Sequence, residues 1–200
     1  MERNFLRKSL IETTKRAELI EYAIYGVVLV LLTLVMPLVV RTLPPGNFVV
    51  QNNQFIVGPA VNAALILAAL NLRGAVRLSS IVLLPSVTAI SLGVFAFVGN
   101  VFMLYIVPAI WAGNAVLVLC FKYLYVHRQL NYIFVAAVAV MGKAAVIFLT
   151  YNILVWSGVI MMGGPVDTVM SSMMGLTQVI TATAGAVIAY GIVRLRGRLQ

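Results

Sequence analysis

Residues 130–156, LNYIFVAAVAVMGKAAVIFLTYNILVW, decide the class of fold because they form one long apolar run with a single charged side chain, Lys143. A helix that crosses the hydrocarbon core of a membrane needs about 20 predominantly apolar residues. The run lacks the strict alternation of a half-buried strand, and it contains Ala and Gly, which membrane helices tolerate. We therefore predict a transmembrane helix here, with a lysine near its middle.

The composition of the whole chain extends this interpretation. Of its 200 residues, 62% belong to the set AVILMFWYC and 10% are charged, whereas soluble domains have roughly 45–50% apolar and about 25% charged residues. An ordinary soluble domain is excluded, and we predict an all-α integral membrane protein with six transmembrane helices in one bundle. The prediction is a single transmembrane domain over residues 1–200, with a cytoplasmic amphipathic segment at 1–21 and spans near 22–40, 58–72, 78–98, 103–121, 130–156 and 169–193.

The basic residues predict the orientation of the bundle. Twelve of the 14 Lys and Arg residues precede the first span, follow the last span, or lie in the second and fourth connections. Positive charge accumulates in cytoplasmic loops, so we predict that both termini are cytoplasmic. The net charge of +9 then sets the orientation and contacts anionic lipid headgroups. No nucleic-acid partner is needed to explain it.

The longest predicted connection, at 43–57, has a polar middle at 51–54 and apolar edges. Two interpretations of this segment stay open. It folds back over the mouth of the bundle as a lid, or it is a solvated linker between two spans.

Polar side chains inside the predicted spans are the candidates for a binding site, because it is costly to bury them in a membrane. Counted along each span at about 1.5 Å per residue, Asn114, Lys143 and Gln178 lie near the middle of the membrane. Asn62 lies nearer the outer surface, and Trp111 shares a helical face with Asn114. We predict a substrate-binding site made of Asn62, Trp111, Asn114, Lys143 and Gln178.

Lys143 is the most informative of these residues because no Asp or Glu occurs within any predicted span. A buried ammonium group without a carboxylate must lose its proton, bond amide and backbone acceptors, or meet an anion from outside the chain. In the first interpretation Lys143 binds the carboxylate or phosphate of a substrate, Trp111 covers an apolar ring, and the amides fix the orientation. In the alternative, Lys143 snorkels to an interface or is bonded by Asn114 and Gln178.

Small residues form a second pattern. Ala60, Ala64 and Ala68 recur every four residues along the second span, and such faces let helices approach closely. We predict that this face docks another membrane subunit, with packing inside the chain as the alternative. A similar series in the last span is expected to pack inside the chain.

The sequence lacks the motifs of common enzymes. It has no Walker loop, no HExxH or GxSxG motif, and no pair of carboxylates inside a span, which are the groups that such chemistry uses. His127 stands beside Arg128, where water or lipid headgroups are its expected surroundings, and Cys120 has no second cysteine to pair with. We expect no enzyme, no cofactor and no metal site, and any use of ATP must come from another chain.

Four short stretches, in this order, resemble a family of small six-helix bacterial membrane proteins similar to the substrate-binding S components of energy-coupling-factor (ECF) transporters. The stretches are VGPAVNA at 57–63, IVP at 106–108 followed by WAGNA at 111–115, GKAA at 142–145, and TQVITA at 177–182. The resemblance covers about residues 56–190 and implies a six-helix bundle in a bacterial cytoplasmic membrane. Asn62, Asn114, Lys143 and Gln178 match the polar positions of the family pattern.

In that family the S component captures a vitamin or a metal-related micronutrient from outside and works with a membrane T component and cytoplasmic ATPases. Together with Lys143, the resemblance implies a substrate-binding subunit for uptake of a small, anionic, vitamin-like micronutrient, energised by a separate ATPase complex. The chain departs from the family in its first span, which lacks the Ala-x-x-x-Ala signature for docking the T component. The alternative is a non-transporting assembly or signalling subunit whose buried polar residues only specify helix packing.

Overall fold

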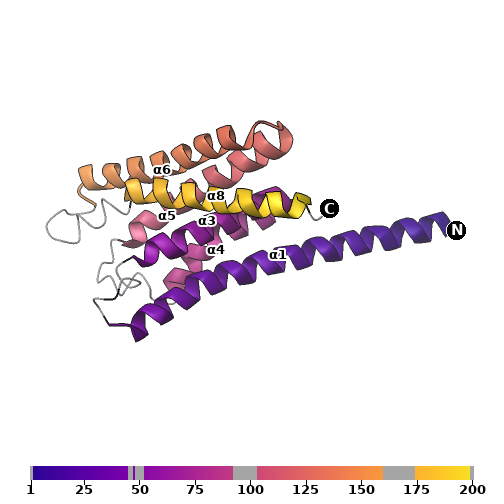
Figure 1. The fold of residues 1–200 in the computed structure, drawn as a ribbon, viewed down its shortest axis with the longest axis horizontal. Coiled ribbons are helices and arrows are strands. Elements are labelled where there is room, and N and C mark those ends of the chain that lie inside the picture. The colour runs from indigo at the N-terminus through magenta and orange to yellow at the C-terminus, as the bar shows by residue number, and fades with distance from the viewer. Residues whose placement is uncertain (1, 45–46, 48–51, 92–102, 160–173, 199–200) are drawn as a thin grey trace.

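The structure, a computed structural model, describes residues 2–44, 47, 52–91, 103–159 and 174–198, and over these residues the chain is helical with no strand. Its helices in chain order are α1 (Glu2–Thr42), α3 (Asn53–Asn71), α4 (Ala75–Ser91), α5 (Met103–Cys120), the π-helix η2 (Phe121–His127), α6 (Tyr132–Trp156) and α8 (Leu176–Arg198). Figure 1 shows one bundle in which α1 begins and α8 ends on the same side. We call this side the terminal end of the bundle and the opposite side the far end.

Five of the described helices are long and apolar enough to cross a membrane, which confirms the prediction of an α-helical membrane protein. These five segments are Lys15–Val35, Asn53–Asn71, Leu104–His127, Tyr132–Trp156 and Leu176–Gly197. The helix α4 is also apolar but has 17 residues, fewer than the roughly 20 that a full crossing needs. The rest of its predicted span, at 92–98, lies outside the described residues.

The boundaries of the first two spans differ from the prediction. The predicted amphipathic segment at 1–21 and the predicted first span lie on one helix, because α1 runs without a break from Glu2 to Thr42. The second span begins at Asn53 rather than at 58, so the end of the predicted connection is helical. The prediction followed the apolar run from 58, whereas the helix also includes a first turn with the polar residues Asn53 and Gln54. Residues 45–46 and 48–51 of the connection lie outside the described residues, and so does the predicted start of the last span at 169.

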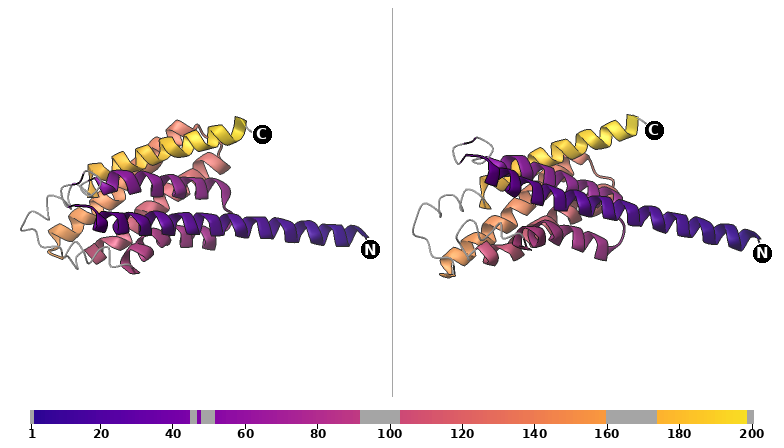
Figure 2. Two further views of the ribbon diagram at one scale, coloured as in Figure 1. Left: turned by 60° about the horizontal axis from the view of Figure 1, so that its bottom comes forward. Right: turned by 90° about the horizontal axis from the view of Figure 1, so that it is seen from below.

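The helix α3 occupies the middle of the bundle. It packs against α8, α1, α5 and α4, while α5 packs along α6. Half of the residues in the apolar part of α3 are buried inside the bundle, whereas 11% of those in the apolar part of α1 are. Figure 2 shows α1 along one side of the bundle, with its N-terminal part extending well beyond the other helices at the terminal end.

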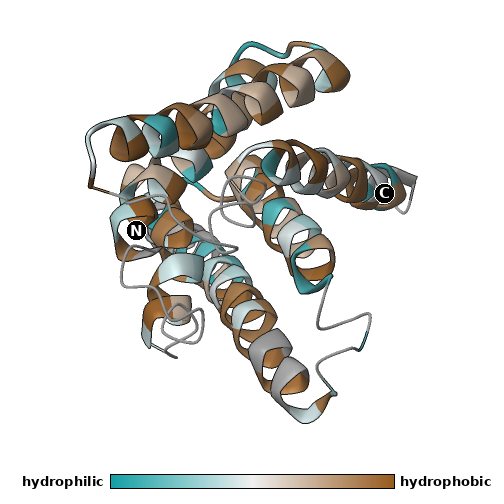
Figure 3. Cartoon of the chain, turned by 90° about the vertical axis from the view of Figure 1, so that its left-hand side faces the viewer, coloured by the Kyte–Doolittle hydropathy of each residue, from teal (hydrophilic) through white to brown (hydrophobic). Residues whose placement is uncertain are grey.

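Large apolar side chains cover the outside of the bundle. Trp156 is 83% exposed, Val76 is 84% exposed and Ile133 is 73% exposed. Figure 3 shows hydrophobic residues along much of the length of the helices. A soluble protein rarely exposes such continuous apolar surface, whereas the hydrocarbon core of a membrane accommodates it.

Candidate functional site

Lys143 lies near the middle of α6 and is 4% exposed. Its Nζ donates hydrogen bonds to Oδ1 of Asn62 on α3 at 2.5 Å and to Oδ1 of Asn114 on α5 at 2.8 Å. Both asparagines are themselves 3% exposed. The lysine therefore joins three helices inside the bundle and does not snorkel to a surface.

Two glycines let the helices that carry these side chains approach closely. A Cβ atom on Gly185 of α8 would lie 2.5 Å from the Cβ of Asn62. A Cβ atom on Gly113 of α5 would lie 2.7 Å from Cγ1 of Ile147, about one turn after Lys143. Both distances are well below the optimal carbon–carbon separation of about 3.5–4.0 Å. A side chain at either glycine would push apart the helices that form the site.

A cavity of about 230 Å³ lies beside Lys143. Its polar lining comes from α1, α3, α4, α5, α6 and α8 and consists of Thr33, Gln54, Asn62, Ser86, Asn114, Lys143, Thr177, Gln178 and Thr181. Gln54 and Thr177 stand in the first turns of α3 and α8, and both of these helices start at the far end. The cavity therefore extends from the middle of the bundle toward the far end.

Lys143 is the one charged group among the described residues that line this cavity. An ammonium group has three N–H donors, and Asn62 and Asn114 accept from two of them. The side-chain amide nitrogens of these asparagines have no hydrogen-bond partner among the described residues, and neither is fully enclosed. The cavity thus offers a positive charge with N–H donors beside it, an arrangement that suits the oxygen atoms of an anion.

The structure brings together four of the five residues predicted from the sequence. Asn62, Asn114, Lys143 and Gln178 all line the cavity. Asn62 accepts one of the two hydrogen bonds of Lys143, although the structural alternative assigned Asn114 and Gln178 to this task. Asn152, which lies on the same helix as Lys143, does not line the cavity and donates to the carbonyl oxygen of Phe148 in its own helix at 2.7 Å.

The structure does not bring Trp111 to this cavity. Its side chain lines a separate groove between α4 and α5, and its Nε1 is buried without a hydrogen-bond partner among the described residues. Residues three apart on a helix differ by about 60° in direction. That difference is enough to turn Trp111 toward α4 while Asn114 points into the bundle. The predicted cover over a substrate ring therefore has no geometric support from Trp111.

The sequence argument missed several small polar residues of the cavity. Thr33, Ser86 and Thr177 line it, and Ser86 and Thr177 are 5% and 6% exposed. Serine and threonine often bond the carbonyl groups of their own helix, as Thr33 does with Leu29 at 2.6 Å. Their residue type alone therefore does not mark a site. Thr177 could have been noticed because it directly precedes Gln178.

The alanine face of α3 lies mostly inside the chain. Ala64 and Ala68 are 6% and 0% exposed and belong to the hydrophobic core. Ala60 is half-buried and lines surface grooves beside α1. Packing inside the chain thus accounts for Ala64 and Ala68, and only Ala60 is left accessible to a partner subunit.

The described residues contain no group of three or more His, Cys, Asp or Glu side chains that could hold a metal ion. A comparison of the chain with protein-family models, curated proteins and solved structures finds no match in any of the three.

Proposed function

We propose that this chain is a substrate-binding membrane subunit for uptake of a small anionic micronutrient, energised by a separate ATPase complex. The observation that carries the proposal is the cavity beside Lys143, in which a buried ammonium group has amide partners and no carboxylate. An isolated charge at membrane depth is costly and usually marks a substrate or ion pathway. An anionic ligand would supply the missing countercharge.

The size of the cavity supports a small ligand. Its volume of about 230 Å³ is below the range of about 300–1,000 Å³ that is usual for pockets of drug-sized molecules. Lys143 would hold a carboxylate or phosphate group, while the amides of Asn62, Asn114 and Gln178 would fix its orientation. The hydroxyl groups of Ser86 and Thr177 would complete the contacts.

We also propose that six segments cross a bacterial-type cytoplasmic membrane, with both termini in the cytoplasm. The basic residues at the terminal end support this orientation through the positive-inside rule. The far end would then face outward, and α4 would complete its crossing with residues after Ser91. The cavity, which extends toward the far end, would receive its ligand from outside.

The energy source of the proposed uptake is another protein. The sequence has no nucleotide-binding motif, so ATP hydrolysis belongs to cytoplasmic ATPases, and a membrane T component would couple them to this chain. This part of the proposal rests on the resemblance to S components of ECF transporters. Co-purification with such subunits would support it.

A specific observation favours a second candidate function. Lys143 already has two amide acceptors, and such a network can serve only to specify how three helices pack. The chain would then be a non-transporting assembly or signalling subunit. Replacing a buried ionic group with an apolar one of similar size is often neutral or stabilising, so Lys143→Met would keep the function of such a subunit intact.

Native mass spectrometry of the protein in mild detergent distinguishes the two functions. The uptake proposal expects a small anionic molecule to be retained by the wild type and lost from Lys143→Met, with the variant still folded. The matched control is Asn152→Ala, on the same helix but bonded to its own backbone, and it should retain the ligand. Equal retention by the wild type and by Lys143→Met would contradict the proposed role of the lysine. A wild type that neither retains nor binds any anionic molecule would favour the assembly function.

A further inference from the structure

A groove of about 560 Å³ runs along the outer surface of the bundle between α4 and α5. Leu78 and Val82 of α4, with Val118 and Leu119 of α5, form apolar walls along it. None of the described residues that line this groove also lines the cavity beside Lys143. The groove is thus a separate feature that the proposed uptake function does not use.

The groove has the length of one membrane leaflet. Trp111 lines it toward the far end and Lys122 toward the terminal end. The two residues are eleven positions apart, which corresponds to about 16 Å of helix. The hydrocarbon core of a bilayer is about 30 Å thick, so one leaflet contributes about 15 Å. An acyl chain that follows the groove from Lys122 would end near Trp111.

The terminal end of the groove carries positive charge. Nζ of Lys122 donates to the carbonyl oxygens of Ala69 at 3.0 Å and Leu72 at 2.7 Å, at the end of α3. These two bonds hold the ammonium group in place and leave its third N–H for a ligand. Arg73 directly follows Leu72, whose carbonyl oxygen accepts from Lys122, so a second positive charge lies near Lys122 and the two repel each other. His127 lines the same end of the groove.

No carboxylate among the described residues neutralises this charge. The one ion pair in the described part of the chain joins Arg77 to Glu18 at 2.9 Å, and it leaves Lys122 and Arg73 without an acidic partner. The π-helix η2 carries Lys122 and His127. Turns of π-helix are rare and often occur at functional sites. An unneutralised pair of cations therefore stands where an apolar groove meets the membrane interface.

We propose that the α4–α5 groove binds an anionic phospholipid from the leaflet at the terminal end. Its phosphate lies between Lys122 and Arg73, which removes the repulsion between them. One acyl chain lies along the groove and covers its apolar walls. Basic pockets between membrane helices recognise anionic headgroups in this way. The site is independent of the uptake proposal, because it shares no lining residue with the Lys143 cavity.

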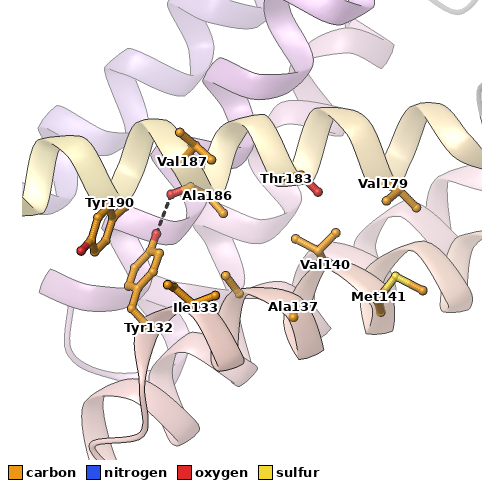
Figure 4. Close-up of a pocket in the computed structure, with 11 residues that line it drawn as sticks. Tyr132, Ile133, Ala137, Val140, Met141, Val179, Thr183, Ala186, Val187 and Tyr190 are labelled. Atoms are coloured by element: carbon orange, nitrogen blue, oxygen red, sulfur yellow. Dashed lines mark hydrogen bonds between the residues drawn. The ribbon is translucent and has the colours of Figure 1, made fainter.

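A second groove, between α6 and α8, serves as an internal control. It has a similar volume of about 510 Å³. Figure 4 shows its lining, in which apolar side chains alternate with Tyr132, Thr183 and Tyr190, and the hydroxyl of Tyr132 bonds the carbonyl oxygen of Ala186. No charged side chain lines it among the described residues. At its end Arg194 donates to the hydroxyl of Tyr190 at 2.9 Å, so this groove can hold an acyl chain with one cation beside it, against the pair formed by Lys122 and Arg73.

The test is a lipid titration of delipidated protein in neutral detergent, read by native mass spectrometry. The probes are phosphatidylglycerol, which is anionic, phosphatidylcholine, which is zwitterionic, and inorganic phosphate. We expect the wild type to prefer phosphatidylglycerol. Arg73→Gln should weaken its binding about fivefold, the effect of losing one cation near an anionic headgroup.

Two matched variants test the groove itself. Ala112 lines the α4–α5 groove and is exposed, so Ala112→Phe should fill the groove and abolish the preference for phosphatidylglycerol. Ala137 lines the α6–α8 groove and is also exposed, so Ala137→Phe should leave the preference intact.

Three outcomes would overturn the proposal. The first is equal affinity of the wild type for both lipids. The second is a preference that survives both Arg73→Gln and Ala112→Phe, with the variants shown by circular dichroism to be folded. The third concerns a thermal-unfolding measurement with each probe. If inorganic phosphate stabilised the protein as much as phosphatidylglycerol does, the site would be one for free phosphate and not for a lipid.

Discussion

In the terminal half of the bundle polar side chains join neighbouring helices, whereas in the far half they surround a cavity. Tyr22 of α1 bonds Ser80 of α4 at 2.9 Å, and Tyr132 of α6 donates to the carbonyl oxygen of Ala186 on α8 at 2.7 Å. Beside Lys143, by contrast, polar groups from six helices leave about 230 Å³ unfilled. Polar side chains thus bond one helix to another in the terminal half, whereas in the far half they line a cavity.

Aromatic packing strengthens the difference between the halves. At the terminal end the ring of Tyr132 lies 5.4 Å from that of Tyr125 and 4.9 Å from that of Tyr190, measured between centroids. A subunit that captures a ligand from one side must be sealed on the other side. The contrast is thus what the proposed uptake function requires, and the variants below test it.

The largest effect is expected at Gly185, where α3 and α8 meet. A Cβ atom there would lie 2.5 Å from the Cβ of Asn62, so Gly185→Ala should lower the free energy of unfolding by about 3 kcal/mol and disturb the cavity. Thermal unfolding in detergent measures this loss. Gly191→Ala in the same helix is the control, because its Cβ would meet no atom within 4 Å. Equal melting temperatures of the two variants would show that the contact is not tight.

The second effect concerns the partners of Lys143. Asn114→Leu removes one of its two acceptors and should cost about 2 kcal/mol, because a buried polar group is left unsatisfied. Lys143→Met in the same chain should recover most of this loss. A double-mutant cycle from thermal unfolding measures the coupling, and additive effects of the two substitutions would contradict the network.

A smaller effect is expected in the terminal half. Tyr132→Phe removes the hydrogen bond to Ala186 and should lower the stability by about 1 kcal/mol. Ligand retention should stay unchanged, because Tyr132 does not line the Lys143 cavity. Measuring both quantities on one preparation tests whether the halves are separable. A loss of ligand without a loss of stability would argue against the separation.

The smallest effect is expected for the ion pair between Glu18 and Arg77. Their side chains are 30% and 31% exposed, so water and salt screen the attraction. Glu18→Gln should lower the stability by about 0.5 kcal/mol or less. Melting curves at low and high salt provide the check, since the difference from wild type should shrink as salt is added. A difference that persists at high salt would show that Glu18 acts through packing.

Several features of the site could be predicted from individual residues. Asn62, Asn114, Lys143 and Gln178 were identified because polar side chains are costly inside apolar spans, and the structure places all four at one cavity. The closeness of Asn62 to Lys143 could not be predicted. It depends on the contacts of α3 with α8 and of α5 with α6, which are made close by Gly185 and Gly113.

Trp111 and Ala68 show where sequence reasoning reaches its limit. Helical periodicity relates residues on the same helix, but it does not say how far that helix is rotated about its own axis. Trp111 therefore faces a groove between α4 and α5, although Asn114, three residues later, points inward. The alanine face of α3 resembled a docking surface, yet Ala68 is fully buried inside the chain.

By itself the sequence determined that this protein is a helical membrane protein with a lysine deep inside an apolar span. Local composition suffices for this, because each residue contributes its own free-energy cost when its backbone or its charge is buried in hydrocarbon. Only the tertiary structure decided which polar groups meet Lys143, that six helices enclose a cavity beside it, and that Trp111 lies elsewhere. These features depend on helix rotation and on close contacts between segments far apart in the chain, which no local pattern contains.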